Sequence, residues 1–235
     1  MRRKTAPKKR VIPARRARRA RRLQPASERA PEVFRRLSAE YPDAGCALDH
    51  HSAYQLLVAT ILSAQCTDKR VNMVTPALFA KYPGVQALAA AHPTELQGLI
   101  RSTGFFRNKS KSLLGMAAAV IAQHAGVVPN TMEALVSLPG VGRKTANVVL
   151  GNAFGRNEGV VVDTHVARLS GRLGLTRATD PVKIEQDLMG IFPTERWTLL
   201  AHLLISHGRN VCDARRPQCD RCTLQAICPS STMKS

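Results

Sequence analysis

Aromatic residues are scarce in this chain of 235 residues, where Phe, Trp and Tyr together make up 4%. Ala, Leu and Val dominate instead, and this composition favours helices over β-sheet. No run of about 18 apolar residues occurs, so we expect no membrane-spanning helix. There is also no convincing pair of strands and no internal repeat. These absences predict an all-α protein, and a hydrophobic share of 44% suffices for one large core or two smaller ones.

Acidic residues are absent from the first 22 positions, which contain 12 of the 35 basic residues. We expect residues 1–23 to form a basic, disordered tail, and a solvated extension and a functional arm explain it equally well. The tail lacks the apolar segment of a secretory signal. Its Arg-rich composition resembles a mitochondrial presequence, although serine is rare. A bacterial-type location in the cytoplasm and nucleoid is expected, and organellar targeting stays open.

The formal net charge of the whole chain is +19. Beyond the tail, 23 basic and 16 acidic residues still leave a charge of +7. Basic side chains that neutralise phosphates release condensed counterions, and this release drives binding to polyanions. The charge therefore predicts nucleic acid as a partner.

Helical periodicity runs through most of the chain and predicts about ten helices. Thr94 to Gln97 has the spacing of a capping box, which predicts a helix start there. A long helix is expected over 108–125, with Gly126 just past its end. Another is expected over 195–207, and we expect Gly208 to end it.

The stretch from Leu138 to Ala146 predicts a tight turn between two helices. Gly140 and Gly142 allow the backbone to approach another backbone or a phosphate closely. The helix that follows presents free N–H groups, which suit an anion. A nucleotide-binding P-loop needs glycine directly before its lysine, where this chain has Arg143. We therefore reject a P-loop.

Lys144 lies in the first turn of that second helix, where the helix dipole disfavours a cation and favours the neutral, nucleophilic amine. Asp163 follows the apolar run Val160 to Val162 and is the expected N-cap of the next helix, which fixes its carboxylate in direction. A nucleophilic lysine and a positioned carboxylate are the parts of a covalent amine mechanism. A surface cation and a simple helix cap explain the same two residues without any chemistry.

Four cysteines near the C-terminus follow the pattern C-x6-C-x2-C-x5-C. They are Cys212, Cys219, Cys222 and Cys228. Thiolates this close in sequence must converge on one centre or pair as disulfides, which are not expected in an intracellular-type chain. Structural zinc usually shows two C-x2-C knuckles, whereas this run has one. The residues themselves favour an iron–sulfur cluster and leave zinc open. Cys46 and Cys66 lie outside the run and are interpreted as buried or inert thiols.

The stretch from Leu138 to Ala146 resembles the helix-hairpin-helix of the DNA glycosylase superfamily. Val162 to Arg168 resembles the segment that carries the catalytic aspartate of that superfamily. Together with the cysteine spacing, the pattern is similar to the endonuclease III family over the range Glu32 to Pro229. The resemblance implies that the four cysteines bind a [4Fe–4S] cluster.

The same resemblance implies two helical domains with a central cleft for DNA and an extruded base. In this chain, residues 46–156 would form a six-helix domain that contains the hairpin. Residues 24–45 and 157–230 would form the iron–sulfur cluster domain. Lys144 and Asp163 would then face each other from different domains.

The implied activity is that of a bifunctional DNA glycosylase and AP lyase, which removes oxidised pyrimidines such as thymine glycol in base-excision repair. Lys144 would attack C1′ and form a Schiff base, and β-elimination would nick the strand. The partner would be double-stranded DNA with an oxidised pyrimidine or an abasic site, bound by a monomer. Monofunctional adenine or mismatch-thymine glycosylases share the cysteine spacing but lack the hairpin lysine. A non-catalytic DNA-binding iron–sulfur protein would need no Lys144–Asp163 pair.

Further DNA contacts come only from the resemblance. Gln65 matches the residue that fills the gap left by a flipped base. Phe105 occupies the place of an intercalating wedge that is commonly leucine, so the bulkier ring is a departure. His165 would point into the base pocket or have a structural role. The loop at 155–159 is about one residue longer than usual.

Phosphate contacts are expected from the hairpin and from the basic residues near it. The hairpin would contribute its amides at Gly140 and Gly142. The expected cations are Arg143, Arg168 and Arg172 near the hairpin and Arg215, Arg216 and Arg221 in the cysteine loop.

Overall fold

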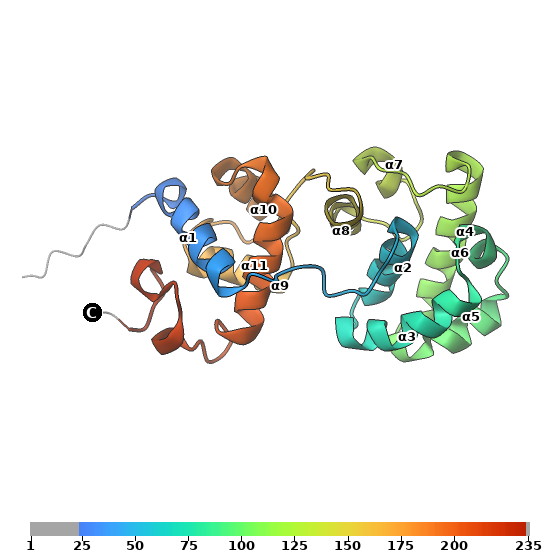
Figure 1. The fold of residues 1–235 in the computed structure, drawn as a ribbon, viewed down its shortest axis with the longest axis horizontal. Helices are drawn as coiled ribbons and strands as arrows, with labels where there is room; N and C mark the ends of the chain where they lie inside the picture. Colours follow the sequence, from blue (N-terminus) through green and yellow to red (C-terminus); the bar gives the residue numbers. More distant parts are fainter. Residues whose placement is uncertain (1–23, 234–235) are drawn as a thin grey trace, which may run out of the picture.

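The computed structural model describes residues 24–233, and the predicted tail at 1–23 lies outside them. Figure 1 shows two groups of helices side by side along the long axis, crossed by the chain segments between α1 and α2 and between α8 and α9. The described residues contain α-helices and short 3-10 turns but no strand, which confirms the all-α prediction. None of these helices combines the length and the apolar composition needed to cross a membrane.

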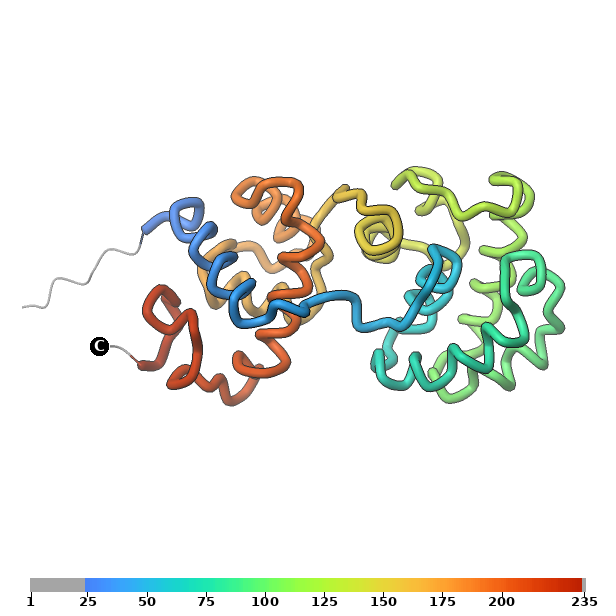
Figure 2. Tube along the Cα trace, in the orientation of Figure 1, coloured from blue at the N-terminus to red at the C-terminus, as the bar shows by residue number. Residues whose placement is uncertain are grey.

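We call the group that contains the predicted hairpin the hairpin lobe (Figure 2). Its helices are α2 (Ala53–Ser63), α3 (Asp68–Lys81), α4 (Val85–Ala89), α5 (Pro93–Ile100), α6 (Phe106–His124), α7 (Met132–Val136) and α8 (Arg143–Ala153), with the 3-10 turn η1 (Arg101–Thr103) between α5 and α6.

We call the other group the terminal lobe, because it joins the two ends of the described chain. Its helices are α1 (Ala26–Glu40), α9 (Thr164–Arg172), α10 (Pro181–Ile191) and α11 (Trp197–Asn210), with 3-10 turns at Thr194–Arg196, Cys219–Arg221 and Gln225–Ile227.

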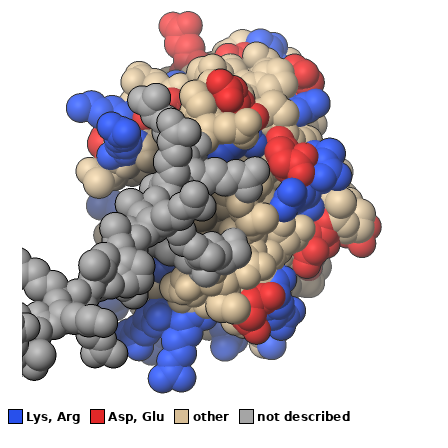
Figure 3. Space-filling model, turned by 90° about the vertical axis from the view of Figure 1, so that its left-hand side faces the viewer, with Lys and Arg blue, Asp and Glu red and all other residues tan. Residues whose placement is uncertain are grey.

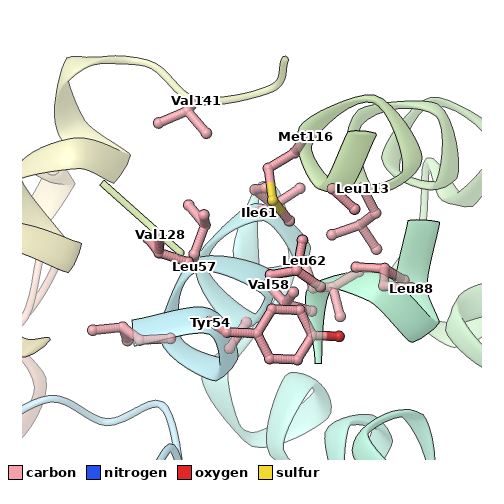
Figure 4. Close-up of a cluster of buried hydrophobic side chains, with 14 of the residues drawn as sticks. Tyr54, Leu57, Val58, Ile61, Leu62, Leu88, Leu113, Met116, Val128 and Val141 are labelled. Carbon is pink, nitrogen blue, oxygen red and sulfur yellow. The ribbon is translucent and has the colours of Figure 1, made fainter. Parts of the chain in front are cut away.

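The hairpin lobe is built around α2. Eight of its 11 residues are buried, so this helix is apolar nearly all round, as a central helix must be. Its start is capped by Ser52, whose side chain accepts a hydrogen bond from the Gln55 amide. In Figure 4, side chains of α2 meet Leu113 and Met116 of α6 in one apolar cluster.

A second apolar core lies in the terminal lobe. Ala30, Val33 and Leu37 of α1 pack there against buried residues between Val160 and Leu224. Val148 of α8 packs partly against both cores. The domain division at 46–156 and at 24–45 plus 157–230 stays our proposal, and the separation of the two cores supports it.

Two predicted helix ends are wrong. Helix α5 begins at Pro93 with no side-chain cap, because proline at the first helical position replaces the capping box expected from Thr94. Helix α11 passes through Gly208 and ends at Asn210. A Cβ atom on Gly208 would lie 3.0 Å from side-chain atoms of Arg168 and of His165. The glycine therefore serves close packing of α11 on α9 rather than helix termination.

Candidate active site

The predicted turn joins α7 to α8 as expected. Gly140 has a φ of 79°, and a Cβ atom there would lie 2.5 Å from the Ser112 Cβ on α6. Only glycine fits this position without strain and without a clash. Gly142 is the extended N-cap residue of α8, and no side chain caps this end. The first amides of α8 are therefore available to an anion, and Lys144 is the second residue of the helix.

Asp163 is the N-cap of α9, as its position predicts. Its Oδ1 accepts hydrogen bonds from the amides of His165 and Val166, each at 2.8 Å. Its Oδ2 lies 3.1 Å from the His165 Nδ1. With 18% of its side chain exposed, the carboxylate can still be reached by a ligand. The three contacts fix its direction.

Lys144 and Asp163 line the same cavity, which has a volume of about 270 Å³. Residues of both lobes form its wall, including Val148 and Asn152 of α8 and Ala201 and His202 of α11. Cys46 also lines it, and burial raises the pKa of the Cys46 thiol, which fits the expected inert character. The two residues that the sequence singled out for covalent chemistry thus lie at one interlobe cavity.

Several polar residues of this cavity were not predicted. Asp43 and Asp68 contribute carboxylates to the wall, and Asp68 pairs with Arg209 of α11 at 2.7 Å. His202 lies 2.7 Å from the Asn152 Oδ1, and burial lowers the pKa of this histidine. The signal was available in the sequence: polar residues at 198, 202, 206 and 209 form one stripe along the otherwise apolar α11.

Arg143 does not point freely toward a phosphate in this structure. Its guanidinium donates two hydrogen bonds of 3.0 Å to Glu185 of α10. Glu185 is buried and also accepts from Asn147 of α8 at 3.0 Å. Arg143 therefore ties the start of α8 to the terminal lobe, and its role in DNA binding stays a prediction.

Gln65, Phe105 and Gly140 meet at a second hollow, of about 220 Å³. Gln65 follows the end of α2 with a φ of 53°, and Phe105 precedes α6 with a φ of 47°. Phe105 is 63% exposed, which is unusual for a large apolar ring. The structure brings these predicted DNA-binding residues together. His165 lies apart from them, with its ring on Asp163, an arrangement that favours a positioning role.

The four cysteines of the C-terminal run surround a third cavity, of about 40 Å³, together with Leu169, Arg172 and His207. No disulfide joins them. Burial raises the pKa of both Cys222 and Cys228. Among the described residues, no three Cys, His, Asp or Glu side chains are arranged to hold a single metal ion.

The expected phosphate contacts of Arg168 and Arg172 stay predictions, because both guanidinium groups bind main-chain oxygens of the chain itself. Arg168 donates to the carbonyl oxygens of Gly208 and Cys212 at 3.0 and 3.1 Å. Arg172 donates to the carbonyls of Asp213 and Ala214 and lies 3.3 Å from the Cys212 Sγ. Both cations satisfy carbonyl groups of the cysteine loop, which has little helix to satisfy them.

Other basic residues of this loop remain at the surface. Asp213 accepts hydrogen bonds from the amides of Arg215 and Arg216, and these bonds lower the pKa of its carboxyl. Both arginine side chains, and that of Arg221, are exposed. On the end view of the molecule, Lys and Arg side chains gather along the lower edge (Figure 3).

Comparison with known proteins bears on this arrangement. Residues 58–194 match the family described as HhH-GPD superfamily base excision DNA repair protein. Endonuclease III of Synechocystis sp. is 54% identical over 211 residues, which cover 90% of this chain and 96% of that protein. Endonuclease III of Bacillus subtilis is 46% identical over 189 residues, 80% of this chain and 86% of that protein.

The chain is also similar to solved structures of endonuclease III bound to DNA. A non-covalent endonuclease III–DNA complex superposes with a TM-score of 0.83 at 41% identity, covering 88% of this chain and 97% of that one. A trapped endonuclease III–DNA covalent intermediate has the same TM-score and identity and covers 88% and 98%. The chain thus belongs to the endonuclease III family of the HhH-GPD superfamily of base excision DNA repair proteins.

Proposed function

We propose that this chain is a bifunctional DNA glycosylase and AP lyase that removes oxidised pyrimidines, with Lys144 as the nucleophile. The observation that carries the proposal is the interlobe cavity that Lys144 and Asp163 share. Its volume of about 270 Å³ is close to the lower limit of typical ligand pockets. The relative that was trapped in a covalent DNA intermediate supports a covalent mechanism.

The reaction begins when the damaged nucleotide rotates out of the duplex into the cavity, because C1′ is not accessible inside the base stack. The neutral amine of Lys144 forms a bond to C1′ while the glycosidic bond breaks, and the base leaves with the bonding electrons and takes up a proton. Opening of the sugar ring gives a Schiff base. Loss of a C2′ proton then expels the 3′ phosphate, and hydrolysis of the imine frees the lysine.

Asp163 acts on this reaction through its charge. Its Oδ1 is occupied by two amides of α9, and Oδ2 lies beside His165. A carboxylate held in this way accepts the proton of the lysine and stabilises positive charge that develops on the sugar. DNA that closes the cavity excludes water and strengthens this interaction, because the effective dielectric constant falls.

Recognition of the lesion uses the second hollow. We assign Gln65 to the gap left by the extruded nucleotide and Phe105 to insertion between bases. The exposure of Phe105 and the closeness of both residues to Gly140 support this assignment. The hairpin amides then hold the backbone of double-stranded DNA, and one chain acts as a monomer.

The cysteine loop fits a [4Fe–4S] cluster held by Cys212, Cys219, Cys222 and Cys228. Their side chains surround one cavity with an apolar wall at Leu169, which suits a cluster of four thiolate ligands. The cluster would supply structural order rather than a redox step. By crosslinking a segment with little helix, it would keep Arg215, Arg216 and Arg221 facing phosphate.

A borohydride trapping experiment tests the nucleophile. Wild-type protein, Lys144→Ala and the control Lys183→Ala are incubated with a duplex that carries thymine glycol or an abasic site. Lys183 is an exposed lysine of α10 outside the cavity. A covalent adduct in the wild type and the control, absent from Lys144→Ala, supports the proposal.

The alternatives give different results in the same gel. Base release by the wild type without an adduct identifies a monofunctional glycosylase. Binding without base release identifies a non-catalytic DNA-binding protein. Analysis of the purified chain for iron and acid-labile sulfide in equal amounts tests the cluster, and zinc in their place would contradict it.

A further inference from the structure

Lys109 is a buried lysine with an unusual set of partners. It lies in the first turn of α6 and is only 5% exposed. Its Nζ donates hydrogen bonds to the carbonyl oxygens of Leu62 and Thr103, both at 2.8 Å. Burial of a cationic group is costly unless its donors are satisfied, and here main-chain oxygens rather than a carboxylate satisfy them. Desolvation accordingly lowers the pKa of Lys109.

The two carbonyl groups belong to chain segments far apart in sequence. Leu62 is in the last turn of α2, where the Cys66 amide turns to the Ser63 oxygen instead. The Leu62 oxygen is therefore one of the orphan acceptors of a helix end, which a cation also stabilises. Thr103 is the last residue of η1. One ammonium group thus bridges the end of α2 and the end of η1.

Each bridged segment leads directly into a residue with left-handed backbone. Gln65 lies three residues after Leu62, with φ of 53°, and Phe105 two residues after Thr103, with φ of 47°. Among the described residues, the only other non-glycine residue with positive φ is Ala125, a helix C-cap. Such conformations persist in non-glycine residues only where the surroundings enforce them. Lys109 itself lines the hollow that Gln65 and Phe105 share.

We propose that Lys109 is a positioning residue, which ties the Gln65 loop to the Phe105 loop and holds both tips at a fixed spacing before DNA arrives. The inference rests on the proposed function, because it takes both tips to enter damaged DNA. Two loops held in place before binding lose less conformational entropy when they insert. The bridge therefore strengthens binding to lesion-containing DNA more than binding to undamaged DNA, into which neither Gln65 nor Phe105 inserts.

Two variants remove the bridge to different extents. Lys109→Met keeps an unbranched apolar stem, one bond shorter than lysine, and removes the charge and all three donors. Lys109→Gln keeps two N–H donors on a stem that is one bond shorter, so that it reaches one carbonyl at most. Lys111→Met, at an exposed position on the same helix, is the matched control. Thermal melting establishes which variants are folded at the assay temperature.

The readouts separate positioning from general folding. Affinity is measured for an undamaged duplex and for one with a tetrahydrofuran abasic analogue, which the lyase cannot cleave. The base opposite the analogue is 2-aminopurine, whose fluorescence rises when insertion of the tips unstacks it. We expect Lys109→Met to bind the lesion duplex about tenfold more weakly, with little change on undamaged DNA and a reduced fluorescence rise. Lys109→Gln should fall between Lys109→Met and the wild type.

A double-mutant cycle completes the test. In a Gln65→Ala/Phe105→Ala background, Lys109→Met should cause no further loss, because the residues through which it acts are gone. An equal loss in that background, or wild-type discrimination in a folded Lys109→Met or Lys109→Gln variant, would overturn the inference while the proposed function stands. If Lys109→Met does not fold, Lys109→Gln decides by the same criteria. A wild-type chain that does not discriminate lesion from undamaged DNA overturns both proposals.

Discussion

The two walls of the interlobe cavity are built in opposite ways. On the hairpin side, Lys144 is an exposed residue at the uncapped start of α8. On the terminal side, Asp163 is held by two amides and the ring of His165. A nucleophile must move along a reaction coordinate, whereas an electrostatic partner is most effective when it is already oriented. In the proposed mechanism, the contrast therefore gives mobility to the amine of Lys144 and rigidity to the carboxylate of Asp163.

The largest effect is expected from removing the mobile partner. Lys144→Ala should lower strand cleavage by on the order of 10⁴-fold or more, because no other group replaces the covalent step. Binding to a duplex with an uncleavable abasic analogue should stay within about twofold, since one exposed side chain contributes little to the interface. Single-turnover cleavage and equilibrium binding measure the two quantities. A parallel loss of both would contradict the assignment of Lys144 as nucleophile.

A smaller effect on the reaction rate is expected when Asp163 loses its charge but keeps its hydrogen bonds to α9. Asn is as good an N-cap residue as Asp, so Asp163→Asn removes the charge and keeps the cap of α9. We expect the rate of base release to fall on the order of 10²- to 10³-fold at an unchanged melting temperature. Asp163→Ala should in addition lose about 1 kcal/mol of stability. Near-normal turnover by Asp163→Asn would show that its charge is not used.

A smaller effect is expected from disrupting the cysteine loop, which belongs to the terminal lobe but does not line the interlobe cavity. Removal of the proposed cluster by chelation, or Cys222→Ala, should weaken binding to undamaged duplex roughly tenfold and make the salt dependence shallower, because the loop arginines lose their alignment with phosphates. Affinity titrations at several salt concentrations measure both effects. Unchanged affinity after complete removal of iron would refute the structural role of the cluster.

The smallest effect is expected from a substitution at Gly140, in the turn that precedes α8 and Lys144. Gly140→Ala forces a Cβ atom to within 2.5 Å of the Ser112 Cβ at a φ of 79° and should cost about 1–3 kcal/mol of stability. Gly171→Ala on α9 is the control, because nothing lies within 4 Å of its Cβ. The control should be neutral or slightly stabilising. Urea unfolding of both variants gives the comparison.

Sequence patterns predicted those parts of the molecule whose signals are local. The glycine spacing of the hairpin, the cap at Asp163 and the closely spaced cysteines all lie within short segments, and the all-α class and the family assignment are confirmed. The pairing of Lys144 with Asp163 across one cavity came from the family resemblance, because no local pattern encodes which distant segments meet. The catalytic and binding roles of the individual residues stay predictions.

The cations show why the remainder was harder to predict. Arg143, Arg168 and Arg172 have the same sequence signal as a phosphate-binding arginine, namely a basic residue near a hairpin. Their partners lie about 40 positions further along the chain, at Glu185 and in the cysteine loop. The packing of distant segments decides which oxygen atoms lie within reach of each guanidinium group, and that packing is a property of the whole fold. The polar stripe of α11 was the one missed signal that a local reading could have used.

In the proposed mechanism Asp163 has two tasks, because the carboxylate that caps α9 also stabilises charge on the sugar. Replacing Asp163 with asparagine would therefore keep the fold and leave only a small fraction of the turnover. The Asp163→Asn variant should still bind damaged DNA and should therefore compete with the active protein for the same sites.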